Sequence, residues 1–133
     1  MSDDSAARFD GKGLMVSMTV KDLKTSLDYY TRVVGFGIVQ EFENEGVVRT
    51  VLINAGNVML LLNQDDGAKG WERVKGQGLS LTILTEDVDA VAAHIKANGG
   101  TLAAEPEDKP WGARMFPLTD PDGFYVTIST PMG

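Results

Sequence analysis

The sequence contains no cysteine and a single histidine, His94, among its 133 residues. Without cysteine the chain can form no disulfide and has no thiolate to act as a nucleophile or a metal ligand. No apolar run approaches the roughly 20 residues of a membrane-spanning helix, so we expect no membrane span. Basic residues number 12 against 19 acidic ones, a net charge of −7. This deficit argues against nucleic acid as a partner, because phosphate binding requires a basic face.

The length and the first residues of the chain limit its organisation. With 43% hydrophobic residues, 133 residues are sufficient for one compact domain and too few for two ordinary ones. Residues 1–12 are polar and lack the apolar segment of a secretory signal. We expect these residues to form a flexible tail and the protein to be cytoplasmic. The negative net charge favours a cationic or neutral partner over an anionic one.

The two halves of the chain repeat one pattern. Residues 13–23 read Gly-Leu-x-Val-x-Met-x-Val-x-Asp-Leu, and residues 78–88 read Gly-Leu-x-Leu-x-Ile-x-Thr-x-Asp-Val. Apolar residues at every second position predict a strand, and Asp22 and Asp87 are suitable N-caps for a helix that follows it. The repeated pattern therefore predicts an internal duplication.

Each repeat is expected to contain one strand, one helix and three further strands. The first module covers residues 13–63, the second covers residues 78–130, and residues 64–77 connect them. The first helix should end at Gly35 and the second near Asn98. The first strands of the modules are expected at residues 14–20 and 79–84, and the remaining strands at 36–42, 47–53, 58–63, 101–104, 114–118 and 124–129.

Residues 109–129 carry the most distinctive pattern. Asp120-Pro121-Asp122-Gly123 has the preferred residues of a type I turn, and the alternating segments on either side predict a hairpin. Trp-Gly-x-Arg-x-Phe at 111–116, followed by this turn, resembles the closing strands of the glyoxalase/bleomycin-resistance/dioxygenase (vicinal oxygen chelate) superfamily, and most closely its bleomycin-resistance branch. The resemblance covers residues 13–130. It implies an α+β fold in which two βαβββ modules form a curved mixed sheet around a cavity.

The resemblance also identifies the positions of a metal site. Most enzymes of the superfamily bind a divalent metal through one residue on the first strand and one on the last strand of each module. The corresponding residues here are Met15, Leu60, Ser80 and Thr127. Such metals prefer imidazole nitrogen and carboxylate oxygen, which these residues lack. We therefore expect no metal, no cofactor and none of the metal-dependent lyase, dioxygenase, epimerase or thiol transferase activities.

Strand alternation divides the side chains between two faces. The face that carries Met15 and Ser80 is predicted to line the cavity, while the other face packs under the helices. Hydroxyl groups together with alkyl and aromatic surface suit an organic ligand, although serine and threonine are also ordinary strand residues. The candidate ligand-binding residues are Met15, Ser17, Leu60, Trp71, Ser80, Thr82, Trp111, Arg114, Phe116, Tyr125 and Thr127.

Several of these candidates have two readings. Trp71 and Trp111 could stack on a planar or cationic ligand or pack in the core, and Phe116 could equally be a core residue. Arg114 could pair with a carboxylate of the ligand or of its own hairpin. Acidic residues at 41–45 and 105–108 are either solvated loop charge or a rim that attracts cations.

The hypothesis that follows is a metal-independent protein that binds and sequesters a cationic or neutral organic molecule, such as a drug in antibiotic resistance or a metabolite. The family resemblance also implies a homodimer. One alternative is a metal-independent isomerase or lyase, which a buried carboxylate pair would favour. The other is a non-catalytic interaction module, which an obstructed cavity would favour.

Overall fold

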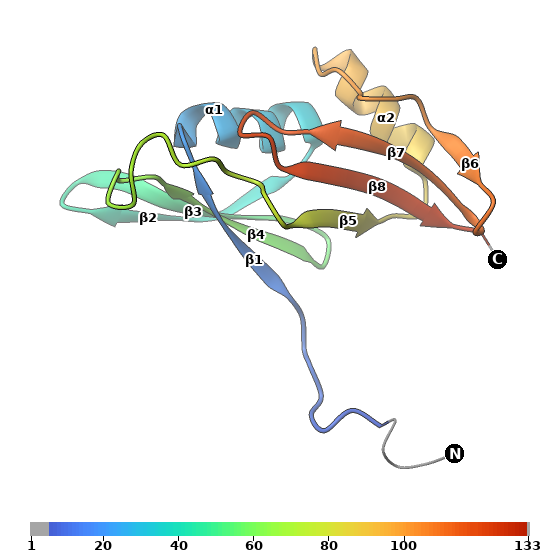
Figure 1. The fold of residues 1–133 in the computed structure, drawn as a ribbon, viewed down its shortest axis with the longest axis horizontal. Helices are drawn as coiled ribbons and strands as arrows, with labels where there is room; N and C mark the ends of the chain where they lie inside the picture. The colour runs from blue at the N-terminus through green and yellow to red at the C-terminus, as the bar shows by residue number, and fades with distance from the viewer. Residues whose placement is uncertain (1–5, 133) are drawn as a thin grey trace.

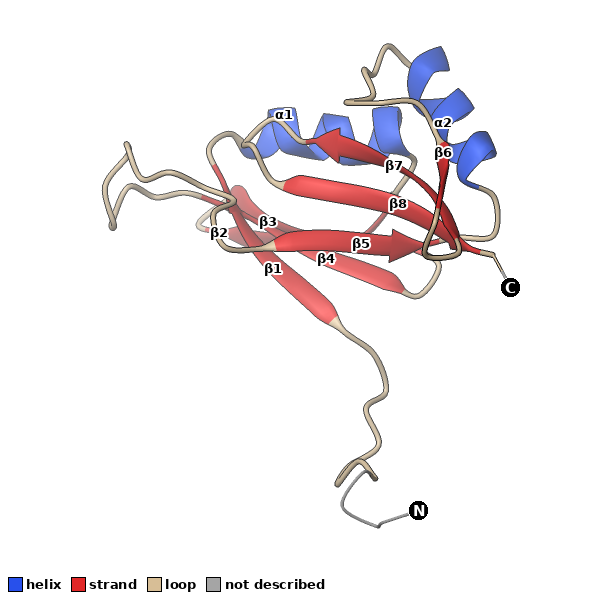
Figure 2. Ribbon diagram, turned by 45° about the vertical axis from the view of Figure 1, so that its right-hand side comes forward, coloured by secondary structure: helices blue, strands red, loops and turns tan. Residues whose placement is uncertain are grey.

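Each half of the chain forms a four-stranded mixed sheet with its helix on one face (Figures 1 and 2). The computed structural model describes residues 6–132, so the first five residues of the expected tail lie outside the described part. The strand orders are β1-β4-β3-β2 and β5-β8-β7-β6, with β1 parallel to β4 and β5 parallel to β8. This confirms the α+β fold of two βαβββ modules.

The strands of the first module are β1 (Met15–Val20), β2 (Gly37–Asn44), β3 (Val47–Ala55) and β4 (Val58–Gln64). Those of the second module are β5 (Ser80–Leu84), β6 (Glu107–Lys109), β7 (Ala113–Thr119) and β8 (Tyr125–Pro131). The helices are α1 (Leu23–Asp28), which continues as the π-helical segment η2 (Tyr29–Val34), and α2 (Val88–Ala97).

The helices begin at the predicted caps. An Asp22 carboxylate oxygen accepts from the Lys24 N–H at 3.2 Å, and Asp87 accepts from the Ala90 N–H at 3.1 Å. The first helix ends at Gly35, whose φ of 115° is left-handed and therefore favours glycine. The π-helical turn before Gly35 is a feature that the apolar spacing did not predict. Within residues 6–132, neither helix is long and apolar enough to cross a bilayer.

One hydrophobic core lies between the helices and the covered faces of both sheets. Gly100 permits close packing there, because an added Cβ would lie 2.5 Å from side-chain carbons of both Val33 and Ile95. The buried core strand residues are Met18, Val20, Val51, Ile53, Leu60, Leu62, Phe116, Leu118, Val126 and Ile128.

The expected strand at residues 101–104 is wrong, because β6 forms only at Glu107–Lys109. Residues 101–104 do approach the outer edge of β7, where the Ala103 N–H donates to the Pro117 carbonyl at 3.1 Å. In a regular antiparallel ladder the residue at position 117 would also donate its own N–H back to the carbonyl of Ala103. Proline has no N–H, so this second hydrogen bond cannot form. Pro117 therefore prevents a regular ladder at this point.

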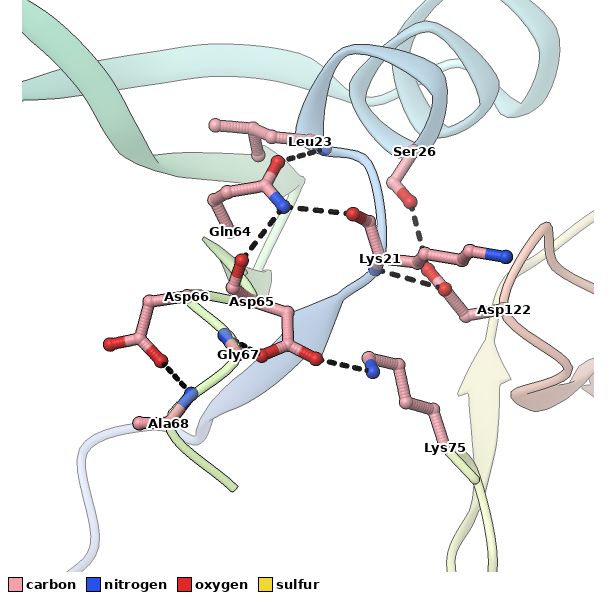
Figure 3. Close-up of polar contacts among 10 residues, drawn as sticks. All are labelled: Lys21, Leu23, Ser26, Gln64, Asp65, Asp66, Gly67, Ala68, Lys75 and Asp122. Carbon is pink, nitrogen blue, oxygen red and sulfur yellow. Dashed lines mark hydrogen bonds and ion pairs between the residues drawn. The ribbon is translucent and has the colours of Figure 1, made fainter. Parts of the chain in front are cut away.

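The Asp-Pro-Asp-Gly turn joins the second module to the first. It closes as a β-turn, with the Gly123 N–H donating to the Asp120 carbonyl at 3.0 Å. The Tyr30 hydroxyl donates to Asp120 Oδ2 at 2.6 Å, and both side chains are buried. Asp122 accepts from the Lys21 N–H at 3.0 Å and from the Ser26 hydroxyl at 3.1 Å (Figure 3). Burial raises the pKa of Tyr30 and that of Asp120.

Candidate ligand-binding site

The face of each sheet opposite the helices is open, and the strand register identifies its residues. In the parallel pair β1–β4, Met15 lies beside Met59, Ser17 beside Leu61 and Thr19 beside Asn63. In β5–β8, Ser80 lies beside Tyr125, Thr82 beside Thr127 and Leu84 beside Ser129. The alternation had predicted this face for the candidates on β1, β5 and β8, and the structure places them there. That these residues bind a ligand stays a prediction.

Three candidates lie on the helix-covered faces instead. Leu60 is 1% exposed and pairs with Val16, so the prediction that Leu60 lies on the same face as Met15 is wrong. Leu60 had been chosen because it lies four residues after the turn glycine Gly56, and this offset has the wrong parity for β4. Phe116 is fully buried in the core. For Leu60, the hydrogen-bonded register with β1 determines which face of the sheet the side chain occupies, and counting from a turn glycine does not.

The side chain of Arg114 also lies on a covered face and has protein partners. Its Nε and Nη2 donate to the two carboxylate oxygens of Asp89 on α2, each at 3.0 Å. Its Nη1 donates to Asp108 on β6, also at 3.0 Å. The Arg114 guanidinium lowers the pKa of Asp89, which is the direction expected for a carboxylate beside a cation. Arg114 therefore pairs with carboxylates of the protein, but these lie on α2 and β6 and not in its own hairpin.

The two tryptophans are exposed and lie outside the strands. Trp71 is 65% exposed and its indole covers Gly67, where an added Cβ would lie 2.3 Å from the ring. Trp111 is 68% exposed in the turn before Ala113, which pairs with Pro131 at the end of β8. Since a strand rises by about 3.3 Å per residue, Trp111 lies on the order of 20 Å from Tyr125. Trp111 therefore does not lie beside Tyr125.

An apolar groove of about 690 Å³ lies between β1 and β4 on one side and β5 on the other. Strands β1 and β5 each pair on one edge only, because they terminate their sheets. The predicted residues Leu60, Ser80 and Thr82 contribute to the groove wall. Its aliphatic lining also includes Leu14, Val16, Leu79, Leu81 and Ile83.

A second hollow, of about 350 Å³, lies where β1 meets the connector. Its lining includes Ser17, Thr19, Leu79 and the connector residues Arg73, Val74, Lys75 and Gln77. The hollow is therefore bounded by hydroxyl groups from the open face and by aliphatic, cationic and amide side chains.

The connector is folded against the end of β1, as Figure 3 shows. Gln64 bridges the backbone of the first helix, since its Oε1 accepts from the Leu23 N–H and its Nε2 donates to the Lys21 carbonyl, both at 2.8 Å. Lys75 pairs with Asp65 at 2.7 Å, with the two side chains 5% and 10% exposed. The Lys75 ammonium lowers the pKa of Asp65. These contacts fix the connector wall of the hollow.

A chain of hydrogen bonds crosses the open face of the first sheet. The Thr50 hydroxyl donates to Asn63 Oδ1 at 3.1 Å, and Asn63 Nδ2 donates to Ser17 Oγ at 2.8 Å. Sequence reasoning missed Asn63 and its apolar neighbours Met59 and Leu61. The correct parity of β4 would have found them, because its register with β1 places all three beside predicted candidates.

The model of the Glyoxalase/Bleomycin resistance protein/Dioxygenase superfamily matches residues 14–128. The chain belongs to this superfamily. This superfamily member is 26% identical over 121 residues to a probable lactoylglutathione lyase of Vibrio cholerae, covering 86% of this chain and 87% of that relative.

Solved structures show the same fold. TioX from a Micromonospora species superposes with a TM-score of 0.75 at 20% identity, covering 92% of this chain and 100% of TioX. TnmS3, an antibiotic binding protein from a Streptomyces species, superposes with a TM-score of 0.68 at 24% identity, covering 95% and 99% of the two chains. At these identities the comparison supports the fold of the superfamily member.

The donor groups of this superfamily member do not fit a divalent metal. On the open faces Met15 lies beside Met59, and Thr127 lies beside Thr82, so the positions that would hold the metal present thioethers and hydroxyls. Divalent metals of this class prefer imidazole and carboxylate ligands. Across residues 6–132, no group of three histidine, aspartate or glutamate side chains is arranged to hold an ion.

Proposed function

We propose that this superfamily member binds and sequesters a small organic molecule without a metal. The observation that carries the proposal is the groove of about 690 Å³ between the two sheets. Its volume lies within the roughly 300–1,000 Å³ of ligand pockets, and its aliphatic walls with a few hydroxyls have the composition of such sites. The structural likeness to TnmS3, an antibiotic binding protein, supports a drug-like or metabolite ligand and a role in antibiotic resistance.

The proposal includes the charge of the ligand and the location of the protein. The net charge of −7 favours a cationic or neutral molecule over an anionic one. A cytoplasmic location is supported by the absence of cysteine, which suits a reducing compartment but does not require one.

We further propose a homodimer in which the second copy lies along the free edges of β1 and β5, so that the ligand groove is enclosed between the two copies. Leu14 and Leu84 lie at these edges, line the groove and are 75% and 64% exposed. Unpaired edges with exposed apolar side chains are suitable for association with another chain. Size-exclusion chromatography with light scattering tests this, and a monomer at all concentrations would contradict it.

The observations favour binding over the two alternatives. The buried carboxylates of residues 6–132 are Asp65 and Asp120, which are engaged by Lys75 and Tyr30 rather than facing each other. This arrangement does not supply the carboxylate pair that an isomerase or lyase would need. The groove is open, which disfavours the interaction module with an obstructed cavity.

A thermal-shift screen of antibiotics and metabolites, with and without EDTA, tests the proposed function. A ligand at a hundredfold excess over its Kd should add about 2.7 kcal/mol to the free energy of unfolding, with no effect of EDTA. Ser80→Trp should abolish the shift by filling the groove, while Gln40→Trp, on an exposed position of β2, serves as the matched control. A shift that EDTA removes, or that survives Ser80→Trp, would contradict metal-free binding in the groove.

A further inference from the structure

We infer that the Ser17 hydroxyl is a directed hydrogen-bond donor, and that a ligand bound over β1 presents an acceptor oxygen of the carbonyl type to it. This inference rests on the proposed binding of a small organic molecule, adds the chemical class of the ligand, and concerns the hollow beside the connector, which shares Leu79 with the groove. It follows from the orientation of one amide, that of Asn63.

The backbone fixes the orientation of the Asn63 amide. One end of this amide faces the carbonyl oxygens of Met18 at 3.3 Å and Leu61 at 3.4 Å. A carbonyl oxygen can only accept, so the atom that faces the two carbonyls is the nitrogen. The amide oxygen consequently faces Thr50, whose hydroxyl donates to it at 3.1 Å.

The orientation of Asn63 determines the role of Ser17. Because Asn63 Nδ2 donates to Ser17 Oγ at 2.8 Å, the serine oxygen is an acceptor in this bond. A hydroxyl carries one proton, which must then point away from Asn63. Among residues 6–132, no protein acceptor takes this proton, and Ser17 lines the hollow of about 350 Å³ beside the connector.

The surroundings make this donor selective. Ser17 lies beside Leu61 on the open face, and the hollow is lined by Val74 and Leu79 together with Arg73, Lys75 and Gln77. In water the free proton is solvated at no cost. A ligand that covers Ser17 without an acceptor would leave a donor unpaired, which a binding site penalises. The site should therefore prefer a planar apolar molecule with a carbonyl oxygen over the corresponding hydrocarbon.

A matched pair of soluble probes tests this preference. An anthraquinone and an anthracene that carry the same short, uncharged poly(ethylene glycol) chain at position 2 have the same carbon framework and no charge, and they differ in two carbonyl oxygens. Isothermal titration calorimetry with the full chain should show that the quinone binds about five- to tenfold more tightly, the effect of one net hydrogen bond. Ser17→Ala should reduce this ratio to near one and leave the affinity for the anthracene probe unchanged.

Asn63→Asp tests the direction of the hydrogen bonds separately from the presence of the serine. A carboxylate at this position can only accept, so the Ser17 hydroxyl donates its hydrogen bond to it and no longer to a ligand. The ratio of the two probe affinities should therefore also fall to near one, although Ser17 is retained. Thr119→Val, an isosteric loss of a hydroxyl on β7, is the control and should leave the ratio unchanged. If Asn63→Asp lowers stability too far for titration, Ser17→Ala alone decides the test.

The outcomes separate this inference from the proposed function. Equal binding of both probes by the wild-type protein overturns the inference and leaves the proposed function intact. A preference that survives Ser17→Ala also overturns it. Binding of neither probe also overturns the inference, and the antibiotic and metabolite screen with Ser80→Trp decides the proposed function.

Discussion

Tyr30→Phe should measure the strength of the contact between the two modules. The substitution removes one oxygen and retains the ring, which packs edge-on against Tyr29 and Phe36 at centroid distances of 5.3 and 5.8 Å. It deletes the hydrogen bond of 2.6 Å from the Tyr30 hydroxyl to Asp120 Oδ2. The perturbation is therefore confined to one buried polar contact between modules.

The expected loss follows from what remains around Asp120. Its Oδ1 still accepts from the N–H groups of Asp122 and Phe124, each at 2.9 Å, while Oδ2 loses its donor. A hydrogen bond to a charged group contributes about 1.5–3 kcal/mol, and leaving the acceptor buried without a partner carries a similar cost. For a domain of this size each kcal/mol corresponds to roughly 3–5 °C, so the Tm should fall by about 5–15 °C.

Urea denaturation at pH 7, followed by circular dichroism, gives the free energy of unfolding of both proteins. Tyr125→Phe is the matched control, because Tyr125 is 47% exposed on the open face and its change should lie within about 0.5 kcal/mol. The midpoint should shift for Tyr30→Phe with an unchanged slope. Equal effects of the two substitutions would refute the reasoning that the Tyr30–Asp120 contact holds the modules together.

The remaining predictions concern pH, metals and surface residues. Burial raises the pKa of Tyr30 above its unfolded value of about 10, so its contribution is complete below pH 10 and is lost as pH rises further, by up to about 1.4 kcal/mol per pH unit. Tyr30→Phe should reduce that alkaline slope, and an unchanged slope would contradict the assignment. Elemental analysis should show less than one equivalent of zinc, nickel, manganese or iron per chain, since Met15, Ser80 and Thr127 offer no suitable donors; one equivalent lost on mutating them would overturn this. Trp111→Ala should change stability by no more than about 0.5 kcal/mol, because the side chain is 68% exposed, and unfolding of this variant would show a packing role.

The repeated pattern and the family resemblance together predicted the fold. Alternation and capping depend on local chemistry, so the sequence reveals most of the strands and the caps at Asp22 and Asp87 directly. The turn at residues 120–123 was predictable for the same reason. Its partners were not, because Tyr30 lies 90 residues away from Asp120 in the chain and neither residue indicates the other.

The candidate site was predictable only in part, since it depends on parity. An error of one residue in the register moves every side chain of a strand to the opposite face. For β4 this error predicted Leu60 on the open face, where the structure has Met59 and Leu61. The orientation of Asn63 could not be predicted, because two backbone carbonyls from different strands determine it. Arg114 likewise paired with Asp89 on a helix, a contact that hairpin chemistry alone does not indicate.

The long separation of the contacts between modules has a consequence for synthesis of the chain. Asp120 follows Tyr30 by 90 positions in the chain, and Asp122 follows Lys21 by 101. At about 5–20 residues per second, roughly 5–20 s pass on the ribosome between these partners. The first module therefore emerges with its tyrosine hydroxyl unpaired, and the last hairpin to be made provides the contact that joins the two modules. A nascent chain released before residue 120 would lack that contact.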